Sequence, residues 1–162
     1  MRAVTFQAPG VVAVDERPEP ELLARDDAVV AIKATGICGS DLHIYHGRVK
    51  IEPGFTIGHE YVGTVIAAGA EATGLIGRPV ALFGGSMWAD YRAADAAAVT
   101  ELPDDVSAAE GAALFVNPLT ALSMVGTMRA EGHHALVHTA AASNLGQMLV
   151  RICAADGIGL VN

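Results

Sequence analysis

Two short polar segments, each adjoining an apolar run typical of a strand, constrain the fold of this chain more than any other feature. Residues 36–43 read Gly-Ile-Cys-Gly-Ser-Asp-Leu-His, and residues 58–60 read Gly-His-Glu. Residues 28–35 precede the first segment and residues 61–67 follow the second, and both runs are Val-rich and partly alternating. We therefore expect the two segments to converge at one end of a β structure.

The side chains of Cys38, His59 and Glu60 predict a metal site within these segments. Cys, His and Glu bind Zn²⁺, and a catalytic zinc ion typically has three protein ligands and one open position. Gly36 and Gly39 allow the backbone to turn tightly around the thiol. The alternatives are a buried structural cysteine and a His-Glu pair on a solvated strand edge, but the three side chains together favour a metal site.

Three neighbouring residues have candidate catalytic roles. The hydroxyl of Ser40 could hold the proton of a zinc-bound alcohol, and the imidazole of His43 could carry that proton to water. The alternatives are a helix cap for Ser40 and a surface histidine for His43. Asp41 is a candidate for orienting His59, because ligand imidazoles usually donate to a carboxylate. Its alternative role is a charge at a helix N-terminus.

Short strands predict a compact, barrel-like β unit in the first part of the chain. They are expected at residues 2–6, 11–15, 28–35, 61–67, 79–83, 88–92 and 98–102, with a short helical turn at 39–46. Ser107 and Glu110 form a capping-box pattern that predicts a helix running toward Asn117. Pro118 should break or restart that helix, and a second helix is expected over residues 119–128.

The last part of the chain has the pattern of a parallel α/β sheet. We expect, in this order, a strand at 134–138, a turn of small residues, a helix at 145–155 ended by Gly157 and a strand at 158–161. The turn lacks a G-x-G-x-x-G fingerprint, so an ordinary strand-to-helix turn is the alternative to a nucleotide site. The candidate cofactor-binding residues are Thr120, Thr139, Ala142, Ser143, Asn144, Leu145 and Gly146.

Composition limits the classes of partner. The chain of 162 residues is 52% hydrophobic and has a net charge of −8, which favours a globular protein and argues against a nucleic-acid partner. A nucleotide cofactor remains compatible, because backbone N–H groups at a helix start can hold phosphates. With two distant cysteines, no leader pattern and no apolar run of about 18 residues, we expect a cytoplasmic protein that does not enter a membrane. A strand edge at residues 158–161 would favour a homo-oligomer.

Residues 36–43 together with residues 58–63 closely resemble the zinc-binding alcohol dehydrogenases of the medium-chain dehydrogenase/reductase superfamily. The resemblance covers essentially the whole chain. It implies a chaperonin-10-like β-barrel catalytic domain over residues 1–115 and the beginning of a doubly wound (Rossmann) nucleotide-binding domain over residues 116–162, in an α+β and α/β arrangement. The chain would then be the first half of a longer protein.

The resemblance also implies an activity. Cys38, His59 and Glu60 match the catalytic zinc cluster, Ser40 and His43 match the proton relay, and Asp41 matches the residue behind the ligands. The implied reaction is hydride transfer between NAD or NADP and an alcohol/carbonyl substrate, in which zinc acts as a Lewis acid. Phe83, Trp88 and Phe115 would give the site an apolar side, or would belong to the core.

The sequence departs from this family in two places and leaves three hypotheses open. Residues 70–95 contain no cysteine, so we expect no structural zinc. Asn117 stands where a further ligand is expected, and residues 117–121 resemble zinc-free quinone and enoyl reductases that favour NADPH. The hypotheses are a zinc-dependent alcohol dehydrogenase, a zinc-free NADPH-dependent reductase and a catalytically silent fragment.

Overall fold

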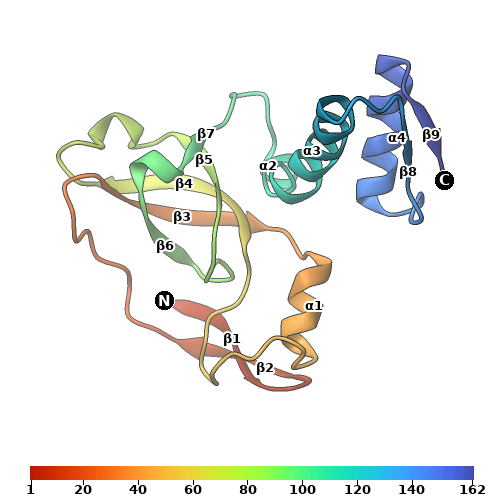
Figure 1. The fold of residues 1–162 in the computed structure, drawn as a ribbon. Coiled ribbons are helices and arrows are strands. Elements are labelled where there is room, and N and C mark those ends of the chain that lie inside the picture. The colour runs from red at the N-terminus through yellow and green to blue at the C-terminus, as the bar shows by residue number, and fades with distance from the viewer. The chain divides into compact units, whose positions relative to one another are not determined.

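The chain folds as two compact units, Met1–Ala113 and Leu114–Asn162 (Figure 1). The computed structural model describes residues 1–162, except for the side chain of Phe83. The predicted role of that side chain therefore lies outside the described residues. The assignment of a catalytic and a nucleotide-binding role to the two parts of the chain stays a prediction.

The first unit is built from antiparallel strands. They are β1 (Arg2–Ala8), β2 (Val11–Glu16), β3 (Asp27–Thr35), β4 (Glu60–Ala68), β5 (Pro79–Phe83), β6 (Tyr91–Asp95) and β7 (Thr100–Glu101). Five of them form a sheet in the order β6-β3-β4-β5-β7, and β1 pairs with β2 as a hairpin. Isolated bridges from Ala3 to Ala89 and from Thr5 to Thr56 join the hairpin to the rest of the unit. The predicted GroES-like β fold is confirmed.

The core of this unit lies between the central strands. Val30, Val65 and Val80 are buried on β3, β4 and β5, and Tyr61 and Met87 pack with them. β-branched residues suit this pleated, buried surface, which explains the Val-rich sequence of the central strands.

Two strands of the first unit begin later than predicted. β6 begins at Tyr91 rather than 88, because Val4 N–H donates to Trp88 O and Ala89 bridges to Ala3. Residues 88–89 are therefore tied to β1 before pairing with β3 begins. The strand expected at 98–102 is reduced to β7, because a 3₁₀ turn, η2 (Ala96–Ala98), precedes it.

The helical turns of the first unit are short. They are α1 (Gly39–Tyr45), η1 (Thr73–Leu75), η2 and α2 (Ala108–Gly111). The predicted capping box is present, with Ser107 and Glu110 bonded to each other's backbone N–H groups. The expected continuation to Asn117 was wrong, because α2 ends after one turn. A new helix begins at Val116 and places Pro118 in its first turn, where a missing N–H loses no intrahelical bond.

The second unit is a strand–helix–strand unit preceded by a helix. Its elements are α3 (Val116–Ala130), β8 (Ala135–Val137), α4 (Asn144–Asp156) and β9 (Gly159–Val161), and β8 and β9 are parallel. Ala121 and Val125 of α3 pack against Leu149 and Cys153 of α4. Gly157 has a φ of 66° and ends α4 in the left-handed conformation that favours glycine. This is the beginning of a parallel sheet, as predicted.

Among the described residues, no helix has the length and apolar character needed to cross a membrane.

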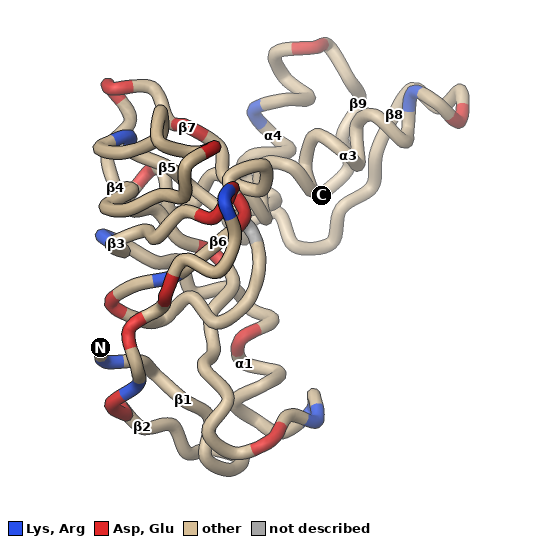
Figure 2. Tube along the Cα trace, turned by 90° about the vertical axis from the view of Figure 1, so that its left-hand side faces the viewer, with Lys and Arg blue, Asp and Glu red and all other residues tan. Residues whose placement is uncertain are grey.

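In the first unit, basic residues occur singly among the acidic ones along the strands and loops (Figure 2).

Candidate metal centre

The turn between β3 and α1 fixes the first candidate ligand, Cys38. Cys38 is the N-cap of α1, and its backbone N–H donates to Asp41 Oδ2 at 2.9 Å. Asp41 N–H donates in turn to Cys38 O at 3.1 Å. A carboxylate at this helix position satisfies a donor that would otherwise lack an intrahelical partner, so Cys38 is held by its own helix.

The pairing of β3 with β4 brings the second segment beside the first. Thr35 is opposite Tyr61 in the register, and Gly36 N–H donates to Glu60 O at 3.2 Å. A Cβ atom at Gly36 would lie 3.1 Å from Glu60 Oε2, so glycine allows this close approach. Segments about twenty residues apart in sequence therefore meet at the ends of two neighbouring strands.

Cys38, His59 and Glu60 present their donor atoms to one another. The sulfur, one imidazole nitrogen and one carboxylate oxygen all lie within 4.8 Å of each other. The distance from His59 Nε2 to Glu60 Oε1 is 3.6 Å. Glu60 is 6% exposed, and buried carboxylates in proteins are usually paired or bound to metals.

Asp41 determines which nitrogen of His59 faces this group. His59 Nδ1 lies 2.9 Å from Asp41 Oδ1, and Asp41 is buried with 3% exposure. An ionised carboxylate only accepts hydrogen bonds, so Nδ1 carries the proton and Nε2 keeps a lone pair. In neutral His59 the nitrogen available to a metal is therefore Nε2, the one close to Glu60.

The surroundings shift the acidities of all three groups. Burial opposes ionisation of Cys38, but hydrogen bonds with Ser40 and His59 outweigh it and lower the pKa of the thiol. Burial also opposes the charged form of His59, yet contacts with Cys38 and Asp41 raise its pKa. For Glu60, burial raises the pKa, with a smaller contribution from Asp41 and opposition from His59. A thiol that ionises readily, an imidazole and a buried carboxylate fit a zinc ion in their donor chemistry.

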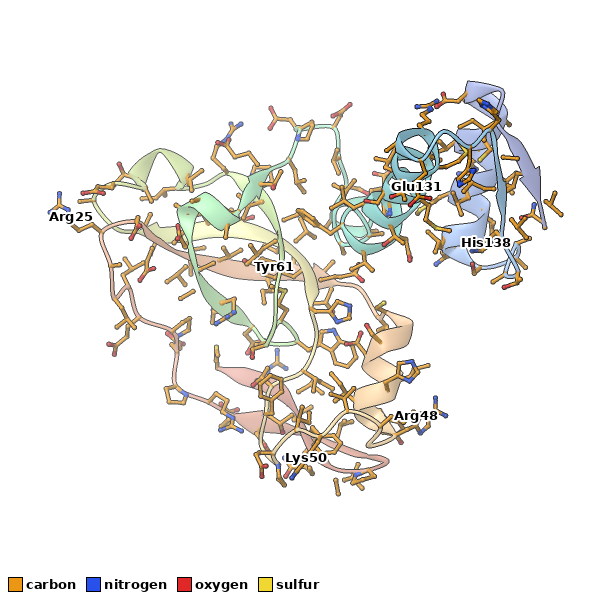
Figure 3. The ribbon with its side chains drawn as sticks, viewed as in Figure 1. Arg25, Arg48, Lys50, Tyr61, Glu131 and His138 are labelled. Atoms are coloured by element: carbon orange, nitrogen blue, oxygen red, sulfur yellow. The ribbon has the colours of Figure 1, made fainter. Side chains whose placement is uncertain are left out.

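The two predicted relay residues have different surroundings. Ser40 Oγ lies 3.3 Å from His59 Nε2, so the structure brings it to the donor group. His43 is exposed, and its Nδ1 lies 3.3 Å from Nη1 of Arg48, which follows α1 (Figure 3). The structure therefore places His43 between the helix and solvent rather than among the three donors.

Trp88 contributes contacts whose importance the sequence did not reveal. Its Nε1–H donates to Gly36 O at 3.1 Å, and its ring occupies the space beside Gly58, where a Cβ would come within 2.2 Å of it. Pockets of about 420 and 230 Å³ lie beside Trp88 and Ile37. The glycine that begins each segment was the one sign of this contact in the sequence, because a residue without a side chain allows another residue to approach.

The predicted cofactor residues of the second unit form a locally bonded turn. Ser143 caps α4 by accepting Gly146 N–H at 3.0 Å, and its hydroxyl donates to Ala140 O at 2.7 Å. A Cβ at Gly146 would lie 2.3 Å from Ala140 O, so glycine is required by packing alone.

The other members of this predicted set lie on the surface or beside it. Thr120 donates its hydroxyl to Val116 O at 2.5 Å within α3. Thr139, Ala142 and Asn144 are exposed, and Leu145 is half-buried. A role of these residues in cofactor binding stays a prediction.

Asn117 is the second residue of α3 and is half-buried.

The chain matches a known domain within its first unit and is similar to known proteins. The alcohol dehydrogenase GroES-like domain matches residues 24–104. A medium-chain reductase/dehydrogenase of Acremonium sp is 43% identical over 74 residues, which are 45% of this chain and 25% of that protein. The zinc-type alcohol dehydrogenase B of Aspergillus flavus is 46% identical over 70 residues, covering 43% of this chain and 16% of that protein.

A solved structure matches both units. The quinone oxidoreductase of Thermus thermophilus, also solved in complex with NADPH, has a TM-score of 0.78 and 28% identity. The match covers 99% of this chain and 51% of that one. The chain thus spans about half the length of this solved structure.

The domain match, the relatives and the fold agree with the motif in residues 36–60. The chain therefore belongs to the alcohol dehydrogenase GroES-like family, within the medium-chain dehydrogenase/reductase superfamily of oxidoreductases.

Proposed function

We propose that this chain provides the zinc-binding catalytic part of an oxidoreductase that transfers a hydride between a nicotinamide cofactor and a small alcohol or carbonyl compound. The observation that carries the proposal is the convergence of Cys38, His59 and Glu60 donor atoms within 4.8 Å. The orientation of His59 by Asp41 supports it, because metal-binding imidazoles usually donate their other N–H to a carboxylate.

In this proposal each residue has a separate task. Cys38 as thiolate, His59 through Nε2 and Glu60 as carboxylate would hold the zinc ion, which would supply a Lewis acid for the substrate oxygen. Ser40, which lies beside His59, would accept the proton of the alcohol, and His43, which is exposed on the same helix, would carry a proton to water. A bound nicotinamide cofactor would accept the hydride from the alcohol carbon, so the alcohol would lose one proton and one hydride in all.

Nicotinamide as cofactor is supported by the structural relative that was solved with NADPH. NAD and NADP both remain candidates. The predicted turn at residues 139–146 would meet the phosphates of either cofactor at the start of α4, where backbone N–H groups favour an anion.

A zinc-free NADPH-dependent reductase is the second candidate. Asn117 favours it, because an amide is a poor zinc ligand and residues 117–121 resemble the zinc-free members of the superfamily. The 28% identity with a quinone oxidoreductase supports the same candidate. The Cys38, His59 and Glu60 group is the observation against it. The chain spans about half the length of that relative.

Metal stoichiometry of the protein purified without chelator tests the proposal. We expect about one zinc ion per chain, which Cys38→Ser should release because a hydroxyl is a weaker zinc ligand than a thiolate. Cys153→Ser is the matched control, because Cys153 is a buried thiol of α4 in the other unit. It should keep the zinc ion.

The absence of zinc from both the wild type and Cys153→Ser would contradict the zinc-dependent proposal. Titration with NADPH and NADH then tests the second candidate. Saturable NADPH binding would favour the zinc-free reductase, and no saturable binding of either cofactor would count against it.

A further inference from the structure

Trp88 contacts both of the segments that carry the candidate zinc ligands. Its indole N–H donates to Gly36 O at 3.1 Å, two residues before Cys38. Its ring fills the space that a side chain at Gly58 would need, and Gly58 immediately precedes His59. One side chain therefore touches both segments, one by a hydrogen bond and the other by packing.

The backbone of Trp88 is itself anchored on both sides. Trp88 N–H donates to Ile57 O at 2.9 Å, and Val4 N–H donates to Trp88 O at 2.7 Å. The preceding Met87, which is fully buried, donates its N–H to Ile57 O and Gly58 O. The indole is thus attached to a fixed point of the β unit, which allows it to hold neighbouring segments in place.

Both ligand segments contain a glycine, whose backbone is less restricted than that of any other residue. Gly36 and Gly58 lie one or two positions before a candidate ligand, and Gly58 has a φ of 91°. Glycine has more conformational freedom than any other residue, so a loop that depends on it is ordered mainly by external contacts.

We infer that Trp88 is a positioning residue that holds Cys38 and His59 at the separation at which one zinc ion can bind both. The inference rests on the proposed function, because it needs the zinc ion. Residues that orient metal ligands typically change metal affinity by about 10-fold to 100-fold when they are replaced.

The first test is Trp88→Phe, which keeps an aromatic ring but removes the indole N–H. We expect zinc affinity, measured by competition with a chromophoric chelator, to fall by about 10-fold. In the Co²⁺-loaded protein, the thiolate-to-cobalt and d–d absorption bands should shift, because the ligand geometry relaxes. Val80→Ala is the control: Val80 is fully buried in the β core, and its loss should lower the melting temperature without shifting the cobalt spectrum.

A second replacement keeps the shape of the side chain and removes only the donor. Trp88 is the only tryptophan of the chain, so 3-benzothienylalanine, in which sulfur replaces the N–H, can be incorporated at this position alone. We expect a loss of zinc affinity in the same direction. This test covers the case in which Trp88→Phe fails to fold.

The outcomes separate the inference from the proposed function. Wild-type zinc affinity and an unchanged cobalt spectrum in a folded Trp88 variant would overturn the inference and leave the proposed function standing. If Val80→Ala weakened zinc binding as much as Trp88→Phe, general destabilisation would explain the effect, and the inference would again fail. A wild type that binds no zinc would contradict the proposed function, and the inference with it.

Discussion

Two regions of the molecule have the same local design, a strand followed by a turn and a capped helix, yet only one gathers reactive side chains. Between β3 and α1, Asp41 accepts the N–H of the N-cap residue Cys38 with one oxygen and contacts His59 of a distant segment with the other. Between β8 and α4, Ser143 makes both of its hydrogen bonds within its own turn. A capping side chain thus becomes part of a site when it has a second acceptor atom that contacts a residue outside its own turn.

Burial separates the two regions in the same way. Asp41 and Glu60 are 3% and 6% exposed, whereas Ser143 and Asn144 are exposed. Keeping carboxylates out of water costs free energy unless hydrogen bonds or a cation compensate. Asp41 has hydrogen bonds of this kind with Cys38 and His59, and a cation beside Glu60 would compensate for the burial of the second carboxylate. The second region is an ordinary helix start that could also receive an anion.

Asp41→Asn should have the largest effect, because it breaks the feature that distinguishes the first region. An amide NH₂ facing His59 Nδ1 would leave the proton on Nε2, and an amide turned the other way would oppose the Cys38 N–H. We expect the free energy of unfolding of the metal-free protein to fall by about 2 kcal/mol and zinc affinity to fall by at least about 10-fold. Chemical denaturation and chelator competition measure the two effects.

Asp90→Asn is the matched control. Asp90 forms an ion pair with the exposed Arg2, and such surface pairs contribute less than about 1 kcal/mol. Equal losses of stability and zinc affinity in the two variants would contradict the special role of Asp41.

Ser143→Ala should have an intermediate effect that is confined to the second region. Loss of the side-chain cap of α4 should lower the free energy of unfolding by about 1 kcal/mol. Zinc affinity should not change. Ser123→Ala, on the exposed surface of α3, removes a hydroxyl that caps no helix and should be close to neutral in the same denaturation experiment. A Ser143→Ala variant as stable as Ser123→Ala would show that the cap is unimportant.

Tyr61→Phe should have the smallest effect on stability at neutral pH. Tyr61 lies on β4, next to the candidate ligand Glu60. The hydroxyl of Tyr61 is buried and lacks a hydrogen-bond partner among the described residues, so its removal should raise stability by less than about 1 kcal/mol. Burial raises the pKa of Tyr61 to about 12 from 10.0. Figure 3 marks its place within the sheet.

The pH dependence follows from that shift. The fold favours the neutral phenol, so this contribution to stability is complete below pH 10 and is lost as the pH rises toward 12. Urea denaturation between about pH 9 and about pH 11.5 should show a steeper loss for the wild type than for Tyr61→Phe. Parallel curves for the two proteins would contradict the raised pKa.

Several features were predictable because their physical causes are local. Alternating Val-rich runs predict strands, the Ser107 and Glu110 pattern predicts a capped helix start, and Gly157 predicts the end of α4. The limits of β6 and of α2 were not predictable. β6 starts late because β1 binds residues 88–89, and a run of small residues does not indicate where a helix such as α2 ends.

For the candidate site, the sequence determined which side chains are available and where the chain can turn. Cys38, His59 and Glu60 stand out by their chemistry, and Gly36 and Gly58 permit close approach. Only the tertiary structure decided that these donors meet, that Asp41 turns Nε2 of His59 toward them, and that His43 lies at the surface beside Arg48. The reason is that these contacts depend on the register between β3 and β4 and on Trp88, which join segments that are distant in sequence.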